Sequence, residues 1–569
     1  MLYPQINKYR QCIDLSGLWD FRFDFNDEGL INNWQNGLND AHPIAVPASW
    51  NEQFAGNRDF LGPAWYQTFF NLPWSWENHR IFLRFGSVNY VANVWLNGEN
   101  LGQHEGGHLP FEYDITSLIK TEKNRLIVRV DGNLAKEHVP PSGRPLNYPN
   151  TNFDFFPFCG IHRPVLIYTM PKEGIKDLTV ITTIEGTNGY INIKIQRTGN
   201  YGENVLIKLS GHSANIISEV PLTGELAKTT LSVDNAALWS PESPNLYDMI
   251  VELSHDGIIF DSYSLSIGIR TIEVKGNQLL LNGKPIKLTG FGRHEDFPII
   301  GKGYFPVILI KDFALLSWIG ANSFRTSHYP YSEQMMDLAD RLGFLVIDET
   351  PAVGLTFDLK IIDRHFELCQ QYIQKLIERD KNHPSVIMWS LANEPHRSIR
   401  ARDFFRKLYE IAKKKDATRP VTIANMMGTG ENTFKFLDII CLNRYYGWYT
   451  QPGRIEEGIE LLSEELDKLY KKYSKPIILS EFGTDTIPGC HAQPPEMFSE
   501  EYQMEFIRRY IELLNTKDYV VGQHVWNLCD FKTAQGILRA GGLNYKGVFT
   551  RDRRPKMAAH VLRKLWKKS

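Results

Sequence analysis

From about residue 271 onward, the sequence alternates between short apolar runs and segments in which apolar residues recur at helical spacing. One such helical stripe runs through Ile459, Leu462, Leu466 and Leu469. The apolar runs end in polar or aromatic residues at 292–295, 327–329, 348–349, 393–394, 425–426, 443–445, 481 and 526–527. Eight alternations of strand and helix over roughly 300 residues predict a (β/α)8 TIM barrel for residues 271–569.

Residues 1–172 lack this rhythm and are predicted to form a jelly-roll-like β-sandwich. Short alternating segments such as Arg80–Phe85 and Asn124–Val130 have the period of half-buried strands. The pair Asn97-Gly98 is typical of a hairpin turn. This part of the chain is therefore expected to be all-β.

Residues 173–270 continue the all-β pattern at shorter spacing. Val205–Leu209 and Met249–Leu253 are predicted strands, whereas Leu238–Tyr247 contains two prolines and is unsuited to a central strand. A unit of about a hundred residues with this pattern predicts an immunoglobulin-like β-sandwich with a structural role. The chain is thus expected to be multidomain, with two β-sandwiches followed by an α/β barrel.

The chain has nearly equal numbers of positive and negative side chains, so it lacks the strong net charge that attracts highly charged partners. Lys plus Arg number 63 and Asp plus Glu 65, so neither nucleic acid nor a membrane is an expected partner. The six cysteines form no CxxC pair and no nucleotide- or metal-binding motif is present, so we expect no cofactor and no metal. The polar first residues and the absence of a long apolar run predict a cytoplasmic protein.

Two of the predicted barrel strands end in a glutamate. The apolar run Ser385–Trp389 leads to Asn393-Glu394-Pro395, where proline ends the regular structure. The run 475–480 leads in the same way to Glu481. A charged side chain at the end of a buried barrel strand requires a solvated pocket, and two carboxyl groups at one pocket are what a glycosidase needs. For either glutamate alone, a helix cap or an ion-pair partner is the alternative.

These motifs resemble glycoside hydrolase family two, and the resemblance covers essentially the whole chain. The stretches Cys441–Tyr449 and Asn544-Tyr545-Lys546 resemble the β-glucuronidases of that family. The resemblance implies that Glu394 is the general acid/base and Glu481 the nucleophile of a retaining double displacement. Such chemistry needs a protonated Glu394 and an ionised Glu481, with the carboxyl groups about 5–5.5 Å apart.

Four further residues are predicted to surround the reacting atoms. Asn393, beside the acid, is suited to the sugar 2-hydroxyl, with a helix cap as its alternative role. By resemblance, Tyr445 falls on the family's tyrosine next to the nucleophile, and Tyr449 on a second substrate tyrosine. Trp526, at the last strand end, is expected to form the floor under the sugar ring, or otherwise to be a core residue.

The resemblance to the β-glucuronidases assigns recognition of a uronic acid to Asn544 and Lys546. A uronic acid differs from a neutral hexose by its C6 carboxylate, which a cation and a neutral donor can bind together. Asp154 falls where the family's first domain reaches into the pocket. Arg539 lies near the family's pocket arginine, but the chain has one residue more than the commonest spacing before Asn544.

Other polar residues also follow predicted barrel strands. His294 and His328 are expected to line the pocket, with a structural histidine as the alternative for each. Asp348 and Glu349 also end a strand, but neighbouring strand residues alternate in direction, so at most one of them can face the pocket. Their context does not resemble Asn-Glu-Pro, and neither is predicted to be catalytic.

The sequence therefore predicts a retaining β-glucuronidase that releases glucuronic acid from small-molecule or glycan glucuronides. Two alternatives remain: a related family-two β-galacturonidase or β-galactosidase, and a non-catalytic carbohydrate-binding scaffold. Asn544 and Lys546 argue against a neutral sugar, and the intact Glu394 and Glu481 argue against the scaffold. A homo-oligomer is expected.

Overall fold

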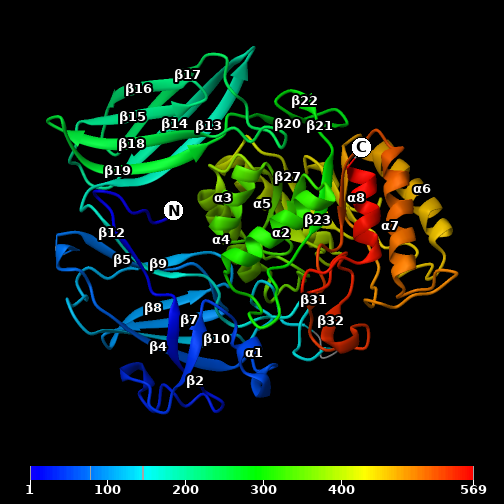
Figure 1. Cartoon of the computed structure of the whole chain (residues 1–569), viewed down its shortest axis with the longest axis horizontal. Coiled ribbons are helices and arrows are strands. Elements are labelled where there is room, and N and C mark those ends of the chain that lie inside the picture. Colours follow the sequence, from blue (N-terminus) through cyan, green and yellow to red (C-terminus); the bar gives the residue numbers. More distant parts are fainter. Residues whose placement is uncertain (1, 77, 144–146, 568–569) are drawn as a thin grey trace.

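Two β-sandwiches and a parallel α/β barrel make up the molecule, as the sequence predicted, so the expected fold class is confirmed. The computed structural model describes residues 2–76, 78–143 and 147–567. Figure 1 shows both sandwiches on one side of the molecule and the barrel with its helices on the other. None of the helices formed by the described residues has the length and apolar character that a membrane span requires.

The first β-sandwich contains β1 (Cys12–Asp14), β2 (Gly17–Phe23), β3 (His42–Val46), α1 (Trp50–Gln53), β4 (Pro63–Phe70), β5 (Arg80–Phe85), β6 (Val88–Asn89), β7 (Val91–Leu96), β8 (Glu99–Glu105), β9 (Phe111–Asp114), β10 (Asn124–Asp131), β11 (Gly160–Ile161) and β12 (Val165–Met170). The main sheets have the orders β1-β12-β5-β9 and β3-β2-β4-β10-β7-β8. In β10, Leu126, Val128 and Val130 enter the core between the sheets, whereas Ile127 packs with Trp65 in a separate cluster. The alternation follows from the two-residue period of a strand.

The second β-sandwich contains β13 (Ile175–Glu185), β14 (Asn188–Arg197), β15 (Asn204–Gly211), β16 (Ala214–Pro221), β17 (Leu226–Val233), β18 (Tyr247–His255) and β19 (Ile258–Ile267). Its sheets have the orders β13-β14-β17 and β16-β15-β18-β19. Ile191, Ile193 and Ile195 of β14 are buried in its core, and the residues between them are more exposed. That pattern is expected of an antiparallel sheet with one solvated face.

The C-terminal part holds β20 (Ile272–Lys275), β21 (Gln278–Leu281), β22 (Lys284–Pro285), β23 (Leu288–Gly292), β24 (Ser323–Arg325), β25 (Leu345–Glu349), β26 (Val386–Asn393), β27 (Val421–Asn425), β28 (Ile440–Asn443), β29 (Ile477–Glu481), β30 (Val520–Val525), β31 (Phe531–Lys532) and β32 (Leu543–Asn544). Within the described residues, β23 to β30 form a closed barrel of eight strands. Pairing of Gly290 with His524 closes it, and the strands run parallel. All residues of β26 are buried, as expected of a strand covered on both faces.

An α-helix follows each barrel strand except β27, which is joined to β28 by a short 3-10 turn (Thr433–Lys435), so the predicted alternation is interrupted there. The helices are α2 (Pro306–Ile319), α3 (Glu333–Leu342), α4 (Ile362–Asp380), α5 (Ile399–Lys415), α6 (Ile455–Tyr473), α7 (Glu500–Asn515) and α8 (Met557–Trp566). The predicted stripe of α6, which includes Leu462, Leu466 and Leu469, is buried. Serine side chains cap the N-termini of α3, α5 and α7. Because every strand is parallel, the carboxyl ends of all barrel strands meet at one face.

Residues 147–158 of the first sandwich extend to the barrel and pack beside the β31–β32 hairpin (Figure 1). The backbone of Tyr148 pairs with that of Gln535, and the Phe156 N–H donates to the Lys532 carbonyl at 2.8 Å. The Asn152 amide donates to the Gly354 carbonyl at 2.7 Å. These contacts bring part of the first sandwich to the barrel face where the strands end.

Candidate active site

A cavity of about 980 Å³ opens at the carboxyl ends of the barrel strands. Barrel strand ends and the segment from the first sandwich both contribute to its wall. It is lined by Asn147, Thr151, Asn152, Phe153, Asp154, His328, Val353, Gly354, Asn393, Glu394, His396, Met426, Gly428, Asn443, Arg444, Tyr445, Tyr446, Tyr449, Thr450, Glu465, Glu481, Trp526 and Arg539. Both predicted catalytic glutamates thus face the same cavity.

Glu394 follows the last residue of β26. Its φ angle of 45° lies in the left-handed region, which costs a non-glycine residue on the order of 1–3 kcal/mol. One of its carboxylate oxygens accepts a hydrogen bond from the Asn443 amide at 2.8 Å. The same amide lies 3.2 Å from the side-chain oxygen of Asn393, so Asn443 fixes both neighbours.

Glu481, the last residue of β29, is held by two donors. The Tyr445 hydroxyl donates to one carboxylate oxygen at 2.7 Å, and the Arg325 guanidinium binds the other. Arg325 also donates to Glu349 at 2.7 Å, and both of these side chains are fully buried. The nucleophile candidate is therefore fixed by a buried network that reaches across three barrel strands.

Burial raises the pKa of both Glu394 and Glu481, that of Glu481 to about 8. For Glu481, Arg325 opposes the rise, whereas a charged Glu394 adds to it. The two carboxyl groups therefore titrate as a pair and hold one proton between them near neutral pH. Hydrogen bonds from Arg325 and Tyr445 oppose the rise in the Glu481 pKa, and the hydrogen bond from Asn443 opposes the rise in the Glu394 pKa.

Trp526 and His328 form an aromatic wall of the cavity. Their rings stack with centroids 4.9 Å apart, and Trp526 is only 4% exposed. His328 Nδ1 lies 3.0 Å from a carboxylate oxygen of Glu349. Burial lowers the pKa of His328 to about 4, so its ring is neutral near neutral pH. A flat apolar surface of this kind suits one face of a sugar ring.

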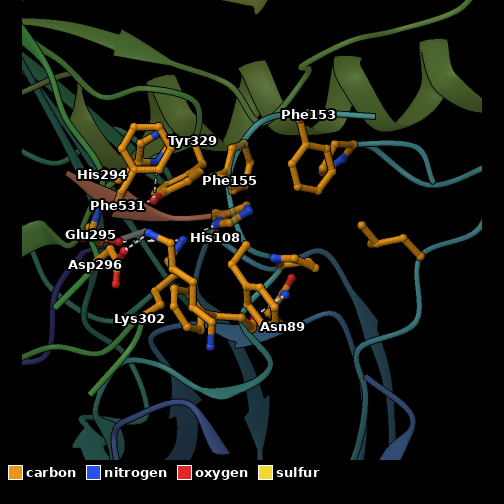
Figure 2. A pocket seen from close by; sticks show the side chains of 16 residues that line it. Asn89, His108, Phe153, Phe155, His294, Glu295, Asp296, Lys302, Tyr329 and Phe531 are labelled. Atoms are coloured by element: carbon orange, nitrogen blue, oxygen red, sulfur yellow. Dashed lines mark hydrogen bonds and ion pairs between the residues drawn. The ribbon is translucent and has the colours of Figure 1, made fainter. Parts of the chain in front are cut away.

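His294 lies outside the catalytic cavity, on the wall of a smaller neighbouring one. Figure 2 shows it beside Tyr329 and Phe531, and its Nδ1 lies 3.1 Å from the Tyr329 hydroxyl. Phe155, from the first sandwich, packs against the His294 ring with centroids 5.0 Å apart. A position at a strand end was therefore not sufficient to place this histidine at the catalytic glutamates.

Lys546 and Asn544 lie directly behind the cavity wall. The Lys546 side chain is 1% exposed, and its ammonium forms an ion pair with Asp485 and donates to the Tyr449 hydroxyl at 2.9 Å. The Asn544 amide donates to Asp154 at 2.8 Å. Two residues that line the cavity, Tyr449 and Asp154, thus connect it with the predicted recognition pair.

Arg539 lines the cavity in front of Lys546. Its guanidinium donates to Asp154 at 2.8 Å and to the Tyr449 hydroxyl at 2.9 Å. The Tyr449 oxygen therefore receives hydrogen bonds from both cations, which brings their charges close together. Paired cations in a largely buried setting are suited to binding a carboxylate.

Two groups of histidine and acidic side chains among the described residues are close enough to share a cation. They are Glu203, His255 and Asp256, and Asp337, Asp340 and His383. Neither group belongs to the lining of the catalytic cavity. We assign no catalytic role to either.

The family described as "Glycosyl hydrolases family 2, TIM barrel domain" matches residues 272–569. The chain belongs to glycoside hydrolase family 2. The sugar binding domain of this family matches residues 13–171, and a further domain described as "Glycosyl hydrolases family 2" matches residues 174–270.

The chain is similar over its whole length to several β-glucuronidases. A β-glucuronidase of Paenibacillus borealis is 41% identical over 597 residues, covering 100% of this chain and 98% of that relative. The β-D-glucuronidase structure from Dictyoglomus thermophilum has a TM-score of 0.92 at 42% identity and covers 100% and 99% of the two chains. A β-glucuronidase from Ruminococcus gnavus in complex with D-glucuronic acid has a TM-score of 0.94 at 38% identity, with 100% and 99% covered.

Three residues of the family 2 site were missed from the sequence: Arg325, Asn443 and Asp485. Arg325 ends a three-residue strand, Ser323–Arg325, in which only Phe324 is apolar, so no apolar run marked it in the way that one marked Glu394. Asn443 was noted only as part of a strand end, and Asp485 follows Glu481 by four positions without a recognisable motif. Their importance depends on partners from distant strands, which local patterns do not specify.

Proposed function

We propose that this family 2 glycoside hydrolase is a retaining β-glucuronidase that hydrolyses β-D-glucuronides to glucuronic acid and an aglycone. The observation that carries the proposal is a pair of cations beside the cavity that holds Glu394 and Glu481. Arg539 lines this cavity, Lys546 lies directly behind its wall, and both donate to the Tyr449 hydroxyl. The C6 carboxylate of a uronic acid can accept charge-assisted hydrogen bonds from such a pair, whereas a neutral hexose cannot. The similarity to an enzyme in complex with D-glucuronic acid supports the same substrate.

In the first step, Glu481 attacks the anomeric carbon while Glu394 donates its proton to the glycosidic oxygen. The bond from the anomeric carbon to the aglycone oxygen breaks, and an ester bond from the sugar to Glu481 forms. Arg325 and Tyr445 keep the attacking carboxylate in one orientation. Asn393 is proposed to bind the 2-hydroxyl, where hydrogen bonds strengthen toward the transition state.

In the second step, Glu394 removes a proton from water, and the resulting nucleophile attacks the anomeric carbon. The ester bond breaks, Glu481 leaves as a carboxylate, and two inversions give overall retention. Since the ester is neutral, Glu394 has no charged carboxylate beside it and ionises more readily in this step. The same residue therefore serves first as acid and then as base.

The remaining proposed roles concern binding and context. Trp526 and His328 provide the wall for the sugar ring, and Asp154 and Tyr449 face the sugar hydroxyls from the cavity lining. Four further expectations stay predictions. They are the carboxyl spacing of about 5–5.5 Å, the domain limits at 172 and 270, the cytoplasmic location and the homo-oligomer.

Lys546→Ala tests the substrate class directly. Loss of the ammonium leaves the bound C6 carboxylate without its partner, which costs roughly 2–5 kcal/mol, or on the order of 30- to several-thousand-fold in kcat/KM. A glucoside carries a neutral CH₂OH group there and loses nothing comparable. We expect kcat/KM for p-nitrophenyl β-D-glucuronide to fall by this factor while kcat/KM for the β-D-glucoside changes little. The ratio of the two values should therefore fall sharply.

Wild-type enzyme assayed with glucuronide, galacturonide, galactoside and glucoside provides the control. Preference for the galacturonide or the galactoside would identify the alternative family 2 activities, and no turnover of any of them would favour the binding scaffold. An equal loss of kcat/KM for glucuronide and glucoside in Lys546→Ala would mean that the lysine supports the pocket structurally and does not bind the C6 carboxylate.

The pH dependence of kcat/KM should be bell-shaped, because the active form of the free enzyme holds one proton on the Glu394–Glu481 pair. On the acid side, protonation of Glu481 removes the nucleophile. On the alkaline side, the last proton leaves the pair near pH 8, the value to which the Glu481 pKa is raised beside a charged Glu394. An activated substrate that needs no protonation should retain kcat/KM further into the alkaline range; identical alkaline limbs for both substrates would contradict the assignment.

A further inference from the structure

Asp485 lies four positions after Glu481 and does not line the catalytic cavity. Its side chain is only 4% exposed, yet it accepts hydrogen bonds from three groups in the 539–546 segment. These groups are the Lys546 ammonium, the Arg539 guanidinium at 3.2 Å, and the backbone N–H of Tyr545 at 2.9 Å. Asp485 therefore ties the loop that follows the nucleophile to the segment that carries both cations.

The charges around Asp485 explain why a carboxylate is needed there. Lys546 and Arg539 donate to one hydroxyl oxygen, that of Tyr449, each at 2.9 Å. Two positive groups this close in a buried setting repel each other unless an anion lies between them. Asp154 binds only Arg539 of the two cations and is 43% exposed at the side chain, whereas Asp485 binds both and is buried.

We propose that Asp485 is a positioning residue that sets the selectivity for an acidic sugar by holding Lys546 and Arg539 together beside the cavity. The inference rests on the proposed β-glucuronidase activity. Because Asp485 acts through the two cations, its effect should be confined to substrates with a C6 carboxylate. The C6 carboxylate takes no part in the bond that breaks, so we expect its loss of binding to appear mainly in KM.

Asp485→Asn in the full-length enzyme is therefore expected to raise KM for p-nitrophenyl β-D-glucuronide on the order of 10- to 100-fold, with kcat changed little. The kcat/KM for the β-D-glucoside should stay within a few-fold of wild type. Asp485→Glu retains the anion and should recover part of the lost glucuronide selectivity. If Asp485→Asn does not fold, the same comparison of the two sugars is made with Asp485→Glu.

Asp530→Asn is a matched control. Asp530 is also buried and accepts from a lysine ammonium, that of Lys556 at 2.8 Å, and from a backbone N–H, that of Gly547 at 2.9 Å. Its loss should lower Tm without changing the glucuronide-to-glucoside ratio.

Equal losses for both sugars in the Asp485 variants, or the same selectivity change in Asp530→Asn, would overturn the inference. The inference would also be overturned if Asp485→Glu lost as much glucuronide-to-glucoside selectivity as Asp485→Asn. Failure of wild-type enzyme to hydrolyse the glucuronide would instead refute the proposed function.

Discussion

Glu481→Gln should reduce kcat on glucuronides by at least about 10⁴-fold, because the neutral amide cannot form the sugar ester on which double displacement depends. The fold should persist. Glutamine has the shape of glutamate and keeps an acceptor for the Tyr445 hydroxyl, and Arg325 retains its ion pair with Glu349. The measurements are kcat with p-nitrophenyl β-D-glucuronide and Tm by calorimetry.

Glu465→Gln is a suitable comparison for that variant. Glu465 also lies at the cavity and is paired with an arginine, Arg444, but it is not assigned to the chemistry. It should lose far less activity than Glu481→Gln. Near-normal turnover by Glu481→Gln, or an equal loss in both variants, would refute the nucleophile assignment.

Glu394→Ala should separate the two steps of the reaction by their need for a proton. Glycosides with poor leaving groups should lose several powers of ten in kcat/KM, because nothing protonates the departing oxygen. A glucuronide whose aglycone leaves as a stable anion should still react with Glu481 in the first step. The glucuronosyl ester on Glu481 should then accumulate, since no base activates water. A kinetic burst of released aglycone would report this state.

Azide provides the second measurement on Glu394→Ala. As an anionic nucleophile it needs no general base, so it should react with the ester and restore turnover as a β-configured glucuronosyl azide. Analysis of the product by NMR gives its anomeric configuration. An α-configured azide adduct would show that the enzyme does not retain configuration, and absence of any rescue would argue against an ester intermediate.

The sequence predicted the fold class and the two glutamates because both depend on local patterns. Strand ends in a parallel barrel meet at one face, so Glu394 and Glu481 were expected to share a cavity before any distance was known. The lining of that cavity by Asn393, Tyr445, Trp526 and His328 follows the same rule. His294 also ends a strand, but it contacts Phe155 and Tyr329 in a different cavity.

The interactions that tune the site could not be predicted in this way. Lys546 was expected to meet a substrate carboxylate, but its buried ion pair with Asp485 joins positions 61 residues apart. Arg325 reaches Glu481 across 156 residues. Such contacts depend on how separate loops pack, and no spacing rule within one segment encodes them.

The ion pair between Arg539 and Asp154 connects residues 385 positions apart, from the last part of the barrel and from the first sandwich. During synthesis, domains fold as units from the N-terminus onward. Asp154 is therefore made, and its domain can fold, long before the ribosome has translated Arg539, Asn544 and Lys546. The enzyme should gain activity only after Lys546 has been translated, and products that terminate before Lys546 should be inactive even where the first sandwich has folded.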